Sequence, residues 1–141
     1  MNKLNYPTVL KIPQLIGREI ILPVTPIPKP RMTRRDKWAE RPCVMRYRAF
    51  KDELRVALED TPFPDDVLIV LFGIPMPNSW SKKKKEKMWT TAHQAKPDVD
   101  NLLKALMDAV MIEDQSIHTV FAQKVWSEEG YIRFVTYPKK Q

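Results

Sequence analysis

The chain contains 141 residues; 24 are Lys or Arg and 17 are Asp or Glu, which gives a formal net charge of +7. This length is typical of one soluble domain, and no apolar run reaches the roughly 18 residues that predict a membrane span. The single cysteine, Cys43, excludes an internal disulfide, and the two separated histidines, His93 and His118, argue against structural zinc. The N-terminus lacks a secretory signal pattern, so we expect a cytoplasmic protein. We assign one domain over residues 18–141, after an extension, residues 1–17, with no assigned role.

Prolines separate the predicted elements in the first half of the chain. Residues 18–24 predict a short strand, with Pro23 at its end or at an edge of the sheet. Residues 25–45 are expected to form a proline-rich loop. Residues 46–59 predict a helix, because four apolar side chains recur there at helical spacing: Tyr47, Phe50, Leu54 and Leu58. A continuous apolar run over residues 66–74 predicts a central strand.

The second half predicts two further helices and two strands. A short basic helix is expected over residues 82–90, capped by Ser79 or Ser81, and a longer helix over residues 98–111, with Asp98 or Asp100 as its N-cap. Strands are expected at residues 117–126 and 131–137, joined as an antiparallel hairpin by the turn at 127–130. The fold class is therefore α+β, a single small domain. Its mixed, mostly antiparallel sheet has about four strands and packs against two to three helices.

The helix over residues 98–111 has two different faces. At about 100° per residue, four polar side chains fall on one side: Asp100, Asn101, Lys104 and Asp108. Four apolar side chains cluster on the other side: Leu102, Leu103, Leu106 and Val110. The apolar face predicts packing against the core, and the polar face is a candidate site.

Carboxylates gather at the start of this helix, which is consistent with a divalent cation. Mg²⁺ takes oxygen ligands and is commonly held by one or two carboxylates, water and substrate phosphate. Asp98 and Asp100 are the candidates, Asp114 is a third, and Lys104 could place positive charge at a phosphate. Aspartate at a helix start is also favoured by capping, and Asp100 with Lys104 matches the ion pair of an ordinary solvated helix. The pattern by itself favours this ordinary interpretation over a metal site.

Two basic clusters suggest contacts with nucleic acid. Ten cations lie between Lys29 and Arg55 against four acids, and a run of lysines follows Ser81. Such surfaces bind phosphates with release of counterions, although a lysine-rich surface also occurs simply for solubility. Trp38 and Trp80 could stack on bases, but packing is the favoured role for both.

The stretch K-P-D-V-D-N-L-L-K-A-L-M-D-A, residues 96–109, resembles the RusA family of Holliday junction resolvases, which are common in prophages. The lysine run before it, His93, and the Pro-Lys-Pro-Arg stretch at 28–31 follow the order seen in that family. So do the later acidic pair Glu113-Asp114 and Lys124 on the next predicted strand. The resemblance covers about residues 18–137.

The resemblance implies a homodimeric endonuclease that uses Mg²⁺ or Mn²⁺ and resolves four-way DNA junctions by symmetric paired nicks. The implied metal ligands are Asp98, Asp100 and Asp114, with Lys104 as the catalytic lysine. Close support is implied for three residues: Asn101, Asp108 and Glu113. DNA contacts are expected from nine cations: Lys29, Arg31, Arg34, Arg35, Lys82, Lys83, Lys84, Lys85 and Lys124. The family often has Asp-Asp where this chain has Glu113-Asp114, and we expect the second residue to be the ligand.

Three other functions remain as alternatives on the sequence alone. A non-catalytic basic DNA-binding module would use the same cations without Mg²⁺, and an RNA-binding protein would prefer RNA. A nuclease that prefers flaps or forks is the nearest enzymatic alternative. Asp98 and Asp100 argue against a protein that only binds nucleic acid, because carboxylates that face phosphate groups would weaken binding.

Overall fold

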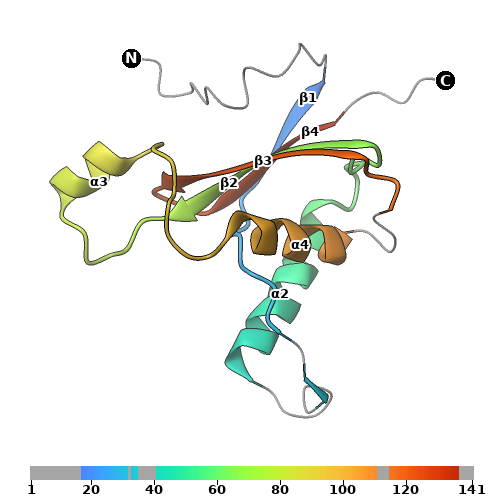
Figure 1. Cartoon of the computed structure of the whole chain (residues 1–141), viewed down its shortest axis with the longest axis horizontal. Helices are drawn as coiled ribbons and strands as arrows, with labels where there is room; N and C mark the ends of the chain where they lie inside the picture. Colours follow the sequence, from blue (N-terminus) through green and yellow to red (C-terminus); the bar gives the residue numbers. More distant parts are fainter. Residues whose placement is uncertain (1–16, 32, 35–40, 111–114, 137–141) are drawn as a thin grey trace.

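A four-stranded mixed sheet carries two helices on one face and a third helix beyond one end (Figure 1). The structure, a computed structural model, describes residues 17–31, 33–34, 41–110 and 115–136. Within these ranges the elements are β1 (Arg18–Leu22), α2 (Pro42–Ala57), β2 (Val67–Pro75), α3 (Lys82–Met88), α4 (Val99–Val110), β3 (Thr119–Ser127) and β4 (Tyr131–Thr136). The predicted α+β class is confirmed, and no helix in the described ranges is long and apolar enough to span a bilayer.

The sheet is built around β2, as its apolar sequence predicts. The strand order is β1-β4-β2-β3. β2 pairs in parallel with β3 from Val67↔Thr119 to Pro75↔Ser127, and it pairs antiparallel with β4 on its other side. β1 adds to β4 in antiparallel fashion as an edge strand and ends at Leu22, directly before Pro23. Two of the three strand pairings are antiparallel, and seven consecutive residues of β2 are buried.

The predicted hairpin of the last two strands is wrong. β3 and β4 do not pair with each other, because β2 lies between them. They are separated by two strand spacings, about 9.6 Å, and the four chain steps from Ser127 to Tyr131 can extend to about 13 Å. A turn of hairpin length can therefore cross the end of β2, where the amide of Met76 donates to the carbonyl of Ser127 at 2.9 Å. The buried β2 gains a partner on each side in this arrangement.

The helix boundaries differ from the predicted ones mainly at α2. This helix begins at Pro42, inside the predicted loop and four residues before the predicted start. Proline suits the first turn of a helix because its missing N–H has no partner there in any case. The cap of α3 is confirmed: the Ser81 hydroxyl accepts a hydrogen bond from the amide of Lys84 at 3.1 Å.

The hydrophobic core lies between the sheet and the two longer helices. α4 buries Leu102, Ala105, Leu106 and Ala109, and α2 buries Val44, Tyr47, Phe50 and Leu54. The same core takes alternate residues of the strands: Leu68, Val70, Phe72, Ile132 and Phe134. This packing determines which face of α4 points to solvent, and so where its polar residues lie.

Candidate active site

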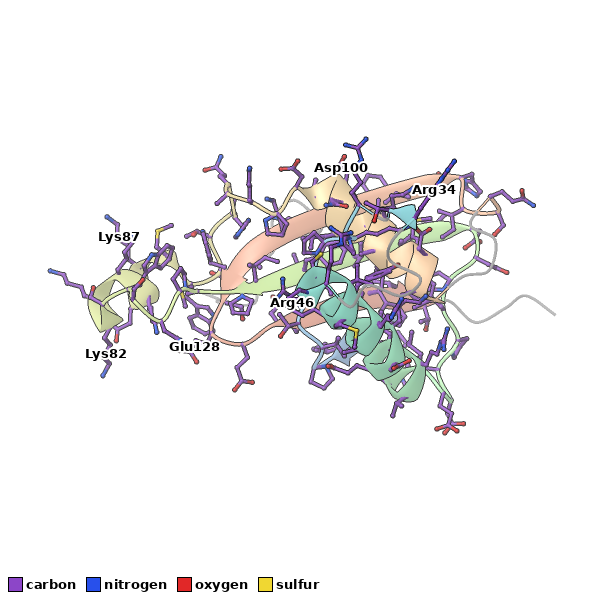
Figure 2. All side chains as sticks on the ribbon, turned by 90° about the horizontal axis from the view of Figure 1, so that it is seen from below. Arg34, Arg46, Lys82, Lys87, Asp100 and Glu128 are labelled. Atoms are coloured by element: carbon purple, nitrogen blue, oxygen red, sulfur yellow. The ribbon has the colours of Figure 1, made fainter. Side chains whose placement is uncertain are left out.

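The polar face of α4 is exposed, as its periodicity predicts. Asp100 in the first turn and Lys104 one turn later are both exposed, whereas Asn101 and Asp108 are half-buried. Figure 2 shows Asp100 on α4, far from α3 with its labelled Lys82 and Lys87. The opposite face of the helix is buried in the core. The candidate catalytic residues on α4 are thus accessible to a macromolecular substrate.

Asp98 lies directly before α4 and is also exposed. Its carbonyl accepts a hydrogen bond from the amide of Leu102 at 3.1 Å, which is the first turn of the helix. Asp98 therefore occupies the N-cap position, while Asp100 lies inside the helix and does not. Both carboxylates lie at the helix end where the free N–H groups favour negative charge.

The ordinary interpretation of this face expects an ion pair between Asp100 and Lys104. In the described part of the chain, neither residue has an ion-pair partner within 4.0 Å, and neither does Asp98. The expected pair is therefore not formed. Two carboxylates and one ammonium group remain available to external ligands.

The donor set suits a hard divalent cation. Asp98 and Asp100 offer exposed carboxylate oxygens, which together with water and phosphate are the usual ligands of Mg²⁺. The described ranges hold no group of three or more His, Cys, Asp or Glu residues that could form a complete cage. The third expected ligand, Asp114, and its neighbour Glu113 lie outside the described residues. Two of the three predicted ligands thus lie at one helix start, and the third stays a prediction.

The segment before α4 is held by Lys124 of β3. The Lys124 ammonium donates to the carbonyl of Ala95 at 2.5 Å and to the carbonyl of Pro97 at 2.6 Å. The resemblance suggests Lys124 as a DNA contact, whereas its charged group is turned toward the protein backbone. No sequence pattern indicates this contact, because the partners are 29 and 27 residues apart.

His93 is a buried residue of the same segment, and no pattern in the sequence predicts its burial. The residue is 4% exposed, and its ring packs against Trp126 with ring centroids 4.2 Å apart. Its Nδ1 atom has no hydrogen-bond partner among the described residues. Burial, together with the nearby charge of Lys124, lowers the pKa of His93 below its ordinary value. His93 is therefore expected to be neutral at pH 7.

The proline-rich segment is tied to α4 by a charged contact. The ammonium of Lys29 lies 2.5 Å from Oδ2 of Asp108 and donates a hydrogen bond to it. This hydrogen bond raises the pKa of Lys29, although burial opposes it. The resemblance predicts a DNA contact for Lys29 and a supporting role for Asp108; the structure brings the two together.

The arginines after Lys29 remain accessible. Arg31 and Arg34 are exposed, and Arg35 lies outside the described residues. The Arg41 guanidinium donates to the carbonyl of Arg31 at 2.8 Å, which connects the start of α2 to this segment. Arg31 therefore lies near the start of α2, and the exposed arginines of this segment are consistent with a phosphate-binding surface.

The lysine run forms α3, which has no buried residue. The helix projects from one end of the sheet, away from α4 (Figures 1 and 2). Aromatic side chains pack where the chain enters this helix: Trp80 contacts Trp126 with ring centroids 4.7 Å apart. The Lys84 ammonium lies 4.2 Å from the centre of the Trp80 ring. Trp80 thus has the packing role that the sequence favours, while Trp38 lies outside the described residues. The lysines of α3 lie at the opposite end of the domain from Arg34.

Comparison with known proteins identifies the family of this chain. A search of curated proteins finds no match. The sequence profile of a family described as Endodeoxyribonuclease RusA matches residues 22–134, which include every described element except most of β1 and the last residues of β4. The match spans Asp98, Asp100 and Lys104 together with both basic clusters. The chain therefore belongs to the RusA family of endodeoxyribonucleases.

Proposed function

We propose that this protein is a Mg²⁺-dependent endonuclease that resolves four-way DNA junctions by paired, symmetric nicks. One observation carries the proposal: Asp98, Asp100 and Lys104 are exposed at the start of α4 without ion-pair partners in the described part of the chain. In a member of an endodeoxyribonuclease family, these groups are suited to act on a DNA phosphate.

Asp98 and Asp100 would hold the metal, with Asp114 as a third ligand and Mn²⁺ as a substitute for Mg²⁺. When bound, such an ion lowers the pKa of water and stabilises negative charge on a phosphate. Asn101, half-buried beside Asp100, and Asp108, bound to Lys29, would support the carboxylates.

Lys104 would stabilise the charge that develops on the scissile phosphate. It follows Asp100 by one helical turn, so both side chains lie on the same face of α4. Its ammonium group has no ion-pair partner among the described residues and can therefore contact an incoming anion. Fixed positive charge aimed at developing negative charge is among the largest contributions to catalysis.

The two basic surfaces would grip the duplex arms of the junction through their phosphates. Arg31 and Arg34 lie on the proline-rich segment, and Lys82 to Lys85 lie on α3 at the other end of the domain. Phosphate contacts position a protein on DNA without reading the base sequence, so recognition would depend on the shape of the junction. A homodimer with two-fold symmetry would present two sites to the two opposed strands.

Cleavage of a labelled synthetic four-way junction tests the proposal. Linear duplex, flap and fork DNA serve as competing substrates, and each reaction is run with Mg²⁺ and with EDTA. We expect Mg²⁺-dependent nicks at symmetric positions in opposed strands. Asp98→Asn should abolish cleavage while junction binding is kept or tightened, because the substitution removes charge repulsion with phosphate.

Asp60→Asn is the matched control, since it neutralises an exposed carboxylate in the turn after α2. It should cleave as the wild type does. Normal cleavage by Asp98→Asn would contradict the metal assignment. Junction binding without cleavage by the wild type would support the DNA-binding module, and faster cleavage of flaps or forks would support the other nuclease. Preference for RNA over both would support the RNA-binding alternative.

A further inference from the structure

The chain from Thr90 to His93 runs alongside the edge strand β3. The amide of Thr90 donates to the carbonyl of Trp126 at 2.9 Å, and the amide of Trp126 donates to the carbonyl of Thr91 at 3.0 Å. Ala92 forms an antiparallel bridge with Val125, and the amide of His93 donates to the carbonyl of Lys124 at 3.0 Å. Backbone pairing thus holds this segment to the sheet as far as His93.

Beyond His93 the segment is held to β3 by hydrogen bonds from a side chain and no longer by backbone hydrogen bonds. Within the described ranges, residues 94–97 form no backbone hydrogen bond to another element. The Lys124 ammonium instead donates to the carbonyls of Ala95 and Pro97, at 2.5 and 2.6 Å. In the described part of the chain, the hydrogen bonds that hold the last residues before Asp98 to the sheet thus come from one ammonium group.

Lys124 itself belongs to the sheet. Lys124 lies in β3 opposite Phe72 of the central strand, and Phe72 is fully buried. The Lys124 side chain is half-buried, and two of its three N–H donors are occupied by the carbonyls. A cation on the sheet thus places the backbone that immediately precedes Asp98.

We propose that Lys124 is a positioning residue that sets the place of the Asp98 carboxylate by holding the carbonyls of Ala95 and Pro97. This inference rests on the proposed function, because Asp98 matters here as a candidate metal ligand. The exposed Asp98 side chain has no ion-pair partner among the described residues, so its location depends on the backbone on either side. That backbone is held by Lys124 before Asp98 and by the first turn of α4 after it.

Kinetics and hydrogen exchange of Lys124→Met test the proposal. Methionine keeps the apolar stem but donates no hydrogen bond. We expect kcat for junction cleavage to fall by about 10- to 100-fold, because even a small displacement of a reacting group slows the reaction strongly. KM and the junction dissociation constant in EDTA should change less than about twofold, because DNA affinity comes mainly from phosphate contacts elsewhere. Exchange should accelerate at the hydrogen-bonded amides that flank the segment, those of His93 and Leu102, and stay unchanged in α2.

Two further variants make the result specific. Lys124→Arg keeps a cation that can donate to two carbonyls, so it should restore slow exchange and much of kcat. Lys96→Met removes an exposed ammonium from the same segment and should leave kcat and exchange unchanged. If Lys124→Met fails to fold, as shown by the absence of a thermal transition, the comparison of Lys124→Arg with Lys124→Gln decides the question.

Several outcomes would overturn the proposal. Weaker junction binding with unchanged kcat and exchange in Lys124→Met would make Lys124 a DNA contact instead. Unchanged kcat despite faster exchange would show that the anchor does not matter for the reaction. If the wild type cleaves no junction, the proposed function fails together with the positioning role, and the exchange data alone then report whether Lys124 holds the segment.

Discussion

The Lys29 ammonium and the Asp108 carboxylate lie 2.5 Å apart, although 79 residues separate them in the chain. The contact joins the proline-rich segment to the exposed face of α4 that carries Asp100 and Lys104. Both side chains are half-buried, at 28% and 30% exposure. Lys29 at the start of the basic segment is therefore held against α4 by a partly desolvated ion pair.

Breaking this pair should destabilise the fold in a pH-dependent way. Lys29→Met should lower the free energy of unfolding at pH 8 by about 1 kcal/mol. Because the folded-state pKa of Lys29 is raised above 10.5, the stabilisation is fully present below that pH and is lost as pH rises through the folded-state pKa. Urea unfolding of both proteins at pH 8 and at about pH 11 to 12 should show the difference shrinking.

Arg55→Gln is the control for this experiment. Its pair with Asp52 is highly exposed and 4.0 Å long, so its removal should have almost no effect. Equal destabilisation by the two substitutions would show that the Lys29 contact has no special role.

Buried His93 should make the protein less stable in mild acid. Burial and the Lys124 charge lower its pKa, so the unfolded chain binds the proton more readily than the folded one. The contribution to stability is present above pH 6.5 and is lost as pH falls through the folded-state pKa. His93→Phe, which keeps a ring against Trp126, should reduce the pH dependence between about pH 7.5 and 5.

His118→Gln is the matched control, because His118 is exposed. Chemical unfolding at several pH values should give parallel curves for this variant and the wild type. A flat curve for His118→Gln together with a wild-type slope for His93→Phe would contradict the assignment.

The close approach of Tyr131 to Gly73 predicts a packing defect. The two residues are cross-strand neighbours, and a Cβ atom added to Gly73 would lie 2.2 Å from Cε1 of Tyr131. Gly73→Ala should therefore destabilise the protein by about 1–3 kcal/mol through displacement of the ring. The same substitution in a Tyr131→Ala background should cost much less in thermal or urea unfolding. Equal costs in both backgrounds would exclude this steric cause.

Neutralising the lysines of α3 should weaken DNA binding with little effect on stability. Lys82, Lys83, Lys84 and Lys85 are on a helix with no buried residue, so changing all four to Gln should shift the melting temperature little. The slope of log affinity against log salt should become shallower by about 0.9 for each phosphate that these lysines neutralise in the wild type. Glu86→Gln on the same helix removes an anion and should leave affinity equal or higher. An unchanged salt slope in the fourfold variant would show that α3 does not bind DNA.

Local periodicity predicts the parts of the fold that depend on local packing. The alternation of polar and apolar residues on α4 places Asp100 and Lys104 on the exposed face, because a helix with one apolar stripe must bury that stripe. The apolar run of β2 predicts its central position, and Pro23 predicts the end of β1. Ser81 is one of two predicted caps, and it is the residue that caps α3.

Strand pairing could not be predicted in the same way. The turn between β3 and β4 has hairpin length, yet β2 separates the two strands. Turn length limits only how far apart two strand ends lie. Which strand fills the space between them depends on the burial of β2, a property of the whole sheet.

The chain by itself therefore determined the candidate catalytic face, through the spacing of residues within a single helix. Only the tertiary structure decided what holds that face in place. Lys29 meets Asp108 across 79 residues, and Lys124 meets Pro97 across 27. No local sequence pattern predicts either contact, because each charged side chain meets its partner only after folding has brought distant segments together.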